Sequence, residues 1–134
     1  MPSVQNAIAF LGFNITNVVF ERPQGFDKGE FIFTMEHIVN VQSDDKNLFQ
    51  VVFIVSVVEK EKPFNLQVQA VADFKIIGEV TGDIYNSFLK INAPAIAYPY
   101  LRAFISTIVI QAGMSNIILP PLNFAQNQLI EKND

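Results

Sequence analysis

The sequence predicts an α+β fold in which a long C-terminal helix packs on one face of a four-stranded antiparallel sheet. Over residues 8–77, apolar residues recur mostly at every second position or in short β-branched runs, as they do in strands. After Gly78 the apolar residues recur at helical spacing. Strands first and helices last are typical of a two-layer α+β domain, and 134 residues suffice for one such core. We therefore treat residues 1–134 as a single domain.

Four segments have the pattern of strands. Residues 8–20 place apolar side chains between small or polar ones, and Gly12 marks an expected bulge or kink. A second strand is expected from Phe31 onward, and residues 49–58 form an apolar, β-branched run typical of a central strand. Residues 64–70 alternate apolar side chains with asparagine and glutamine. We therefore expect a sheet with one apolar face and one face toward water.

Two helical segments are expected after the strands. Residues 83–91 form a short amphipathic segment, with Asp83 or Thr81 as its N-cap. Asn92 is expected to cap a second helix, because Pro94 suits the first turn of a helix.

The second helix is apolar nearly all round. One face carries Leu101, Ile105, Ile108 and Ala112, and another carries Ile96, Tyr100, Ala103 and Ile110. Pro99 is expected to bend this helix, and Gly113 to end it. The chain's own sheet can cover only one side of such a helix, so a second subunit is the simplest cover for the other side. We therefore expect self-association, with a subunit interface that contains Tyr100, Leu101, Phe104, Ile105 and Ile108.

The composition argues against several classes of function. The chain has no cysteine, so disulfides and thiolate metal sites are excluded, which fits a cytoplasmic protein. Its net charge is −4 and its basic residues are scattered, so we expect no binding to nucleic acid. No basic residue precedes Arg22, so a secretory signal is not expected. Residues 93–112 have nearly the length of a membrane span, but Arg102 and two prolines argue against membrane insertion.

Few residues suit catalysis. The one histidine, His37, is expected on a strand next to Glu36, whose side chain points to the opposite face, so no nucleophile and base are paired. The carboxylates lie mostly in polar turns, where they meet water. Motifs for calcium, zinc and phosphate binding are missing. We therefore expect no enzyme, no cofactor and no metal.

Three stretches together resemble the bacterial protein-export chaperone family SecB. The first is Asn17-Val-Val-Phe-Glu-Arg-Pro23, which is similar to the end of the family's first strand and the start of its crossover loop. The second is Phe49-Gln-Val-Val-Phe-Ile-Val-Ser-Val57, which is similar to its third strand. The most specific is Tyr98-Pro-Tyr-Leu-Arg102 followed by Leu119-Pro-Pro-Leu-Asn-Phe124. The resemblance covers about residues 6–124.

This resemblance implies an ATP-independent holdase that assembles as a dimer of dimers, a homotetramer with its long helices between the sheets. Non-native polypeptide clients would bind near residues 23–31 and 113–124. The client-binding residues expected from these two regions are Phe26, Phe31, Met114, Ile117, Leu119, Leu122 and Phe124. A general holdase needs adaptable apolar surface, and the Pro-Pro pair in the second region lowers the entropy lost on binding.

The sheet face that would dock the SecA motor departs from the family. The corresponding positions in this chain are Glu21, Asn17, Asn65 and Gln67, of which only Glu21 is acidic. This departure weakens the expectation that SecA is a partner. Two alternatives therefore stay open beside a general export chaperone: a dedicated chaperone of one partner such as an antitoxin, and a non-chaperone module that binds a small apolar ligand in a walled pocket.

Overall fold

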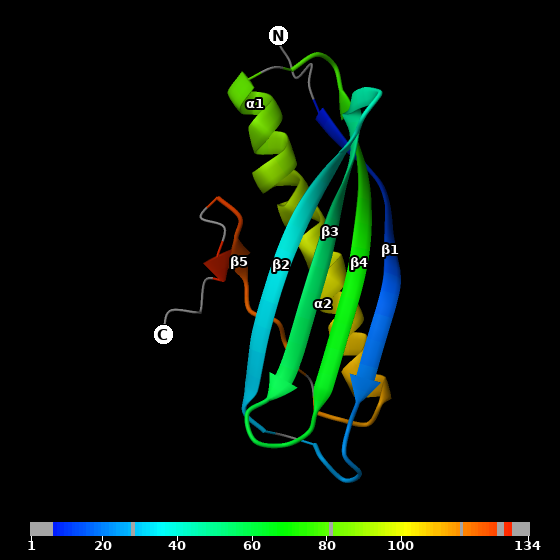
Figure 1. Cartoon of the computed structure of the whole chain (residues 1–134), viewed down its shortest axis with the longest axis vertical. Coiled ribbons are helices and arrows are strands. Elements are labelled where there is room, and N and C mark those ends of the chain that lie inside the picture. The colour runs from blue at the N-terminus through cyan, green and yellow to red at the C-terminus, as the bar shows by residue number, and fades with distance from the viewer. Residues whose placement is uncertain (1–6, 28, 81, 116, 126–127, 130–134) are drawn as a thin grey trace.

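The computed structural model describes residues 7–27, 29–80, 82–115, 117–125 and 128–129. Its main sheet contains the strands β1 (Ala7–Glu21), β2 (Phe31–Gln42), β3 (Asp45–Glu59) and β4 (Asn65–Ile77). The helical layer contains α1 (Gly82–Ser87), η1 (Phe88–Asn92) and α2 (Ala93–Gln111), and two short strands follow, β5 (Leu122–Asn123) and β6 (Gln128–Leu129). All pairings in the main sheet are antiparallel, and the helices cover one of its faces (Figure 1). The expected fold class is confirmed.

The strand order is β1-β4-β3-β2, so the first two strands of the chain are the two edges of the sheet. The connection between them, residues 22–30, therefore has to cross one end of the sheet. We call it the crossover loop. It lies at the end of the molecule where α2 ends, as the bottom of Figure 1 shows. The topology thus brings residues close to position 25 beside residues close to position 113.

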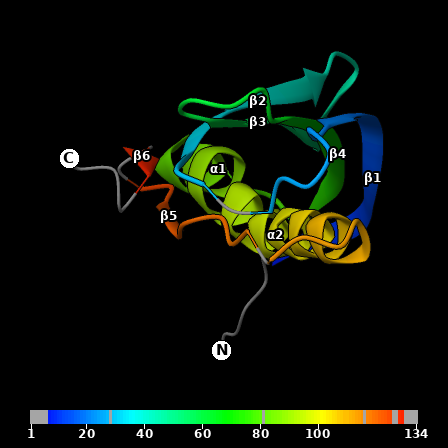
Figure 2. The same ribbon diagram turned by 90° about the horizontal axis from the view of Figure 1, so that it is seen from below.

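The expected bulge in the first strand is present. The register of β1 against β4 passes from Phe10 opposite Phe74 to Gly12 opposite Asp73, which leaves Leu11 without a partner position. Leu11 is 57% exposed. A second shift lies between Ile15 and Asn17. Two bulges in one edge strand bend it strongly, and β1 curls toward the helical layer in Figure 2.

The helical layer is one continuous helix, so the expectation of two separately capped helices is wrong. Asn92 has helical backbone angles and no capping hydrogen bond, and Asp83 lies inside the first turn of α1; Thr81 is outside the described residues. The backbone N–H of Ala93 bonds to the carbonyl of Phe88, five residues back, in a π-helical turn. This wider turn comes directly before Pro94, which has no N–H to donate, and lets the helix continue through it.

One stripe of α2 packs on the sheet. Its members recur at every fourth position and have no exposed surface, and they are Ala93, Ala97, Leu101, Ile105 and Val109. The opposite side of α2 is open in the single chain, where Tyr100 is 52% exposed and Ile110 is 54% exposed. The helix is therefore covered on one side by its own sheet and uncovered on the other, as the sequence predicted.

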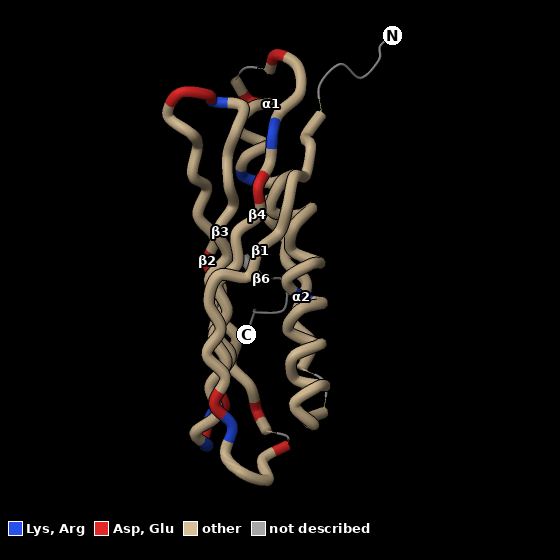
Figure 3. The backbone as a smooth tube through the Cα atoms, turned by 90° about the vertical axis from the view of Figure 1, so that its right-hand side faces the viewer, with Lys and Arg blue, Asp and Glu red and all other residues tan. Residues whose placement is uncertain are grey.

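Most charged residues lie toward the two ends of the molecule (Figure 3). Helix α2 carries a single charged residue, Arg102, whose guanidinium lies 5.9 Å from the ring centre of Tyr98. By length and composition the continuous helix Gly82–Gln111 is the one candidate membrane span among the described residues. Its inner stripe packs on the sheet of the same chain, so that side of the helix is covered by protein.

Candidate functional site

Hydrogen bonds join the crossover loop to the chain that follows α2. The guanidinium of Arg22 donates to the carbonyl oxygens of Phe26 and Ala112. The carboxylate of Asp27 accepts from the backbone N–H of Ser115 at 2.7 Å and from its hydroxyl at 3.2 Å. We call this set of contacts the clasp, and residues 113–125 the C-terminal segment. The clasp holds together the two regions in which client-binding residues were predicted.

Phe26 anchors the crossover loop on the sheet. It is 7% exposed, and its ring centre lies 5.5 Å from that of Phe64 and 6.1 Å from that of Phe31. The ammonium of Lys62 lies 5.9 Å from the same ring centre, within the range of a cation–π contact. Phe31 is half-buried. Phe26 of the loop and Phe31 at the start of β2 thus belong to one aromatic cluster, and neither is freely exposed.

The C-terminal segment returns along the molecule with its apolar side chains turned inward. Four of its predicted client residues are at most 7% exposed, namely Met114, Ile117, Leu119 and Phe124, and Leu122 is half-buried. The hydroxyl of Tyr98 donates to the carbonyl of Pro120. Sequence reasoning missed Ile118, which is 61% exposed. In this state most of the predicted client residues are covered by their own subunit.

A pocket opens between β2, the helical layer and the C-terminal segment. Its volume is about 550 Å³, and its lining residues are His37, Val39, Lys90, Ile91, Phe124 and Ala125. We call it the edge pocket, because β2 is an edge strand. The ring of His37 meets that of Phe124 edge to face, with 5.2 Å between the ring centres. Burial lowers the pKa of His37 from its ordinary value, so the ring is neutral at pH 7.

Sequence reasoning identified only one member of the edge pocket as a client residue, Phe124. His37 was interpreted as a structural residue, and Lys90 was not considered. The two are 53 positions apart in the sequence, and they line the same pocket because the continuous helix runs past the edge of the sheet. No spacing or motif in the sequence indicates that they share a pocket.

The four residues predicted for a partner face lie together on the outer face of the sheet. Asn65 is paired with Glu21, and its amide donates to the Glu21 carboxylate at 3.4 Å and accepts from Gln67 at 3.3 Å. Asn17 and Gln67 line a hollow of about 330 Å³. This face is exposed in the single chain, as expected, and it also carries the exposed apolar side chains of Ile32, Ile38 and Ile54. Glu21 is the one carboxylate among the four predicted partner residues, and Glu36 on β2 is a further exposed carboxylate on the same face.

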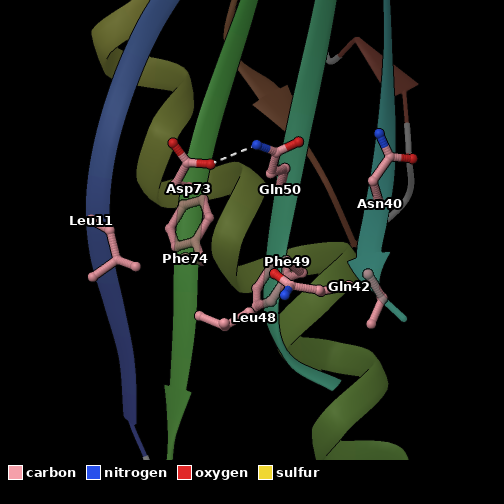
Figure 4. Close-up of a pocket in the computed structure, with 9 residues that line it drawn as sticks. Leu11, Asn40, Gln42, Leu48, Phe49, Gln50, Asp73 and Phe74 are labelled. Carbon is pink, nitrogen blue, oxygen red and sulfur yellow. Dashed lines mark hydrogen bonds between the residues drawn. The ribbon is translucent and has the colours of Figure 1, made fainter. Parts of the chain in front are cut away.

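A second hollow on the sheet lies near the β2–β3 hairpin (Figure 4). Its volume is about 540 Å³, and it extends from Leu11 on β1 to Asn40 on β2. The side chain of Gln50 donates to Asp73 at 2.8 Å inside it. All of its lining residues belong to the sheet, so no second element closes over it. It is not the walled pocket that a small apolar ligand would need.

The predicted subunit interface divides into two sets. Leu101 and Ile105 have no exposed surface, because they face the chain's own sheet, so the prediction that they line the interface needs correction. Tyr100 is exposed, and its ring meets those of Phe10 and Phe13 on β1, with centres 5.0 and 5.8 Å away. Phe104 and Ile108 are half-buried, and they remain available to a partner together with Ile96 and Ile110.

The described residues form no group of three or more His, Asp or Glu side chains that could hold a metal ion. His37 has two phenylalanine rings as its aromatic neighbours, Phe53 at 6.4 Å and Phe124 at 5.2 Å. This apolar surrounding suits packing and binding more than proton transfer. The crossover loop, the C-terminal segment and the edge pocket, with their apolar side chains, are therefore the candidate binding site.

Comparisons with known proteins give a consistent result. A family model described as preprotein translocase subunit SecB matches residues 6–131. An uncharacterized protein of Methanocaldococcus jannaschii is 29% identical over 89% of this chain and 81% of its own length. The protein-export protein SecB of Chromobacterium violaceum is 33% identical over 62% of this chain and 57% of its own length. The match thus covers less than two thirds of that export protein.

One solved structure has the same fold. It is the SecB-like chaperone Rv1957 of Mycobacterium tuberculosis, in complex with a ChAD peptide from the Rv1956 HigA1 antitoxin. The TM-score is 0.69 at 11% sequence identity, and the match covers 87% of this chain and 88% of that chain. At this identity the likeness is evidence for the fold alone.

Proposed function

The chain belongs to the SecB family, and we propose that it is a chaperone that holds non-native polypeptides without nucleotide. The observation that supports this best is the construction of the C-terminal segment. The described residues from 113 to 121 have no helix or strand, yet Met114, Ile117 and Leu119 among them are apolar and buried. A few polar contacts hold the C-terminal segment in place. When the segment detaches, its apolar side chains and the surface beneath them become available to a client.

The clasp sets how readily the surface opens. Arg22, Asp27 and Tyr98 together fix the crossover loop and the C-terminal segment. Each such hydrogen bond contributes about 0.5–3 kcal/mol, the larger values applying to charged groups. A client that buries apolar area gains about 25 cal/mol per Å², so a modest contact area offsets the loss of a few of these bonds. The structure described is then the closed form, and client binding replaces contacts within the subunit by contacts to the client.

The uncovered side of α2 supports self-association of the chain. We propose a homotetramer, a dimer of dimers, in which a second subunit covers Ile96, Tyr100 and Ile110. Their exposure of 38%, 52% and 54% supports an interface on this side. A cytoplasmic location and the absence of catalytic activity belong to the same proposal. The client-binding residues remain Phe26, Phe31, Met114, Ile117, Leu119, Leu122 and Phe124, now as residues that opening would expose.

A dedicated chaperone of one partner is the second candidate function. Two observations favour it over transfer of clients to SecA. Among the four residues predicted for motor docking, Glu21 is the one carboxylate, so the outer face offers little negative charge at those positions. The solved SecB-like chaperone of the same fold holds a peptide of an antitoxin. An antitoxin is therefore the alternative client, and SecA the less favoured partner.

An aggregation assay tests the proposal. The purified full chain is added to an unrelated, chemically unfolded protein as the denaturant is diluted, without nucleotide, and light scattering is followed. A general holdase suppresses scattering at a near-stoichiometric ratio, while an unrelated folded protein of similar size does not. No suppression at several-fold excess contradicts a general holdase. Suppression that is restricted to an antitoxin among a panel of unfolded clients supports the dedicated chaperone.

A further inference from the structure

The edge pocket carries charge of one sign only. Among its six lining residues the titratable ones are His37 and Lys90, which are both basic, and the other four are apolar. Glu36 is adjacent to His37 in sequence, but it is exposed on the opposite face of the strand. Lys90 therefore lies beside an apolar lining, in a chain whose net charge is −4. The pocket therefore differs in charge from the protein as a whole.

We propose that the edge pocket selects extended client segments in which an acidic side chain lies beside apolar ones. The ammonium of Lys90 binds the carboxylate, and Val39, Ile91 and Phe124 hold the neighbouring apolar side chain. Lys90 is exposed, and charge-assisted hydrogen bonds to a carboxylate are stronger than neutral ones. This inference rests on the proposed holdase function and names the kind of client segment that the function would favour.

The position of the pocket on β2 fits an extended ligand. Strand β2 is the last strand in the order β1-β4-β3-β2, and no other described strand pairs with its free side. A peptide that adds to such an edge makes backbone hydrogen bonds and points every second side chain to the same face. His37 and Val39 are two positions apart on β2 and both line the pocket. A carboxylate and an apolar side chain two positions apart on the client can then enter the pocket together.

His37 gives this site a proton-linked signature. In the free protein its neighbours are the rings of Phe53 from β3 and Phe124 from the C-terminal segment, with Lys90 from the helical layer across the pocket. These neighbours disfavour the charged ring. A bound carboxylate has the opposite effect, because an opposite charge nearby raises the pKa of histidine. Binding of an acidic segment is then accompanied by proton uptake at His37.

Two fluorescent peptides with the same apolar sequence test the proposal, one with aspartate and one with lysine at alternate positions. Anisotropy with the full chain is expected to show about three- to tenfold tighter binding of the aspartate peptide, on the scale of one charge-assisted contact. The net charge of the chain would favour the opposite order. Lys90→Glu should abolish the preference, while Lys75→Glu, the same charge change on an exposed residue of β4, should keep it.

The single histidine provides an independent readout. Its NMR titration should move to higher pKa when the aspartate peptide is added and not when the lysine peptide is added. Equal binding of both peptides, tighter binding of the lysine peptide, or a preference that survives Lys90→Glu would each overturn the proposal. The aggregation assay separates the two failures. If aggregation is suppressed but neither peptide is preferred, the proposed selectivity is wrong and the holdase function stands. If aggregation is not suppressed and neither peptide binds, both proposals are wrong.

Discussion

The guanidinium of Arg22 donates a hydrogen bond to the carbonyl oxygen of Ala112, the C-cap residue of α2. The two residues are 90 positions apart, and the contact ties the end of β1 to the end of the long helix. A carbonyl at a helix C-terminus has no partner within the helix and carries a partial negative charge, so a cation is well placed there. This contact makes the closed position of the C-terminal segment depend on the crossover loop.

Replacement of Arg22 by alanine should destabilise the fold. The variant loses the charged hydrogen bonds to Phe26 and Ala112, and we expect the free energy of unfolding to fall by about 1–3 kcal/mol. Urea unfolding followed by circular dichroism measures this change. Lys60→Ala is the matched control, because Lys60 makes an exposed ion pair with Glu30 at 3.8 Å and such pairs contribute little. Equal losses of unfolding free energy in the two variants would show that the hydrogen bonds of Arg22 stabilise the fold no more than an exposed ion pair does.

Asp27→Ala should open the client surface. The change removes both hydrogen bonds from Ser115 and frees the start of the C-terminal segment. We expect more binding of a hydrophobic dye and tighter client binding, because the clasp no longer competes with the client. Equilibrium dye fluorescence and a client titration measure the two effects. Unchanged dye binding in a folded Asp27→Ala protein would contradict the opening model.

The two sides of α2 should respond differently to charge. Ile105→Lys places an unpaired charge in the core, which costs several kcal/mol, so the subunit should unfold. Ile110→Lys places the same charge on the exposed side and should leave the subunit folded while it breaks the assembly. Circular dichroism reports folding, and light scattering reports the mass in solution. An Ile110→Lys protein with unchanged mass would refute an interface on this side of α2.

Stability should fall in mild acid because of His37. Burial lowers the pKa of His37 in the folded protein. Below the ordinary histidine pKa of about 6.5, the unfolded chain therefore binds a proton at His37 while the folded chain does not. The contribution of the neutral ring is complete above that value and is lost as the pH falls toward the folded pKa. His37→Phe should remove this part of the pH dependence. Thermal melts of both proteins from about pH 8 to about pH 5 test this, and parallel curves would be the contrary result.

Much of the fold could be predicted from the sequence because the relevant signals are local. Alternation in residues 64–70 indicated a half-buried strand, and Gly12 indicated the bulge, since both depend on neighbours in the chain. The apolar circumference of α2 likewise indicated an uncovered side. The helix start was predicted wrongly at Asn92, because a proline usually begins a helix and a π-helical turn before it leaves no local sign.

The site was less predictable, because it depends on which distant residues meet. The resemblance indicated two candidate segments, yet it could not tell that Met114, Ile117 and Leu119 are covered in the single subunit. His37 and Lys90 line the same pocket because of the path of the helix past the sheet edge. No pattern in either neighbourhood carries that information.

Site-specific photo-crosslinking tests the central claim most directly. A photoreactive side chain is placed at Ala125, which is exposed at the edge pocket, and in a second protein at Lys75, which is exposed on β4. Each protein is illuminated with a chemically unfolded client and with the same client in its native state. We predict covalent adducts with the unfolded client at position 125, and few at position 75 or with the native client. Equal adducts at both positions, or none at position 125 while aggregation is suppressed, would place client binding elsewhere on the molecule.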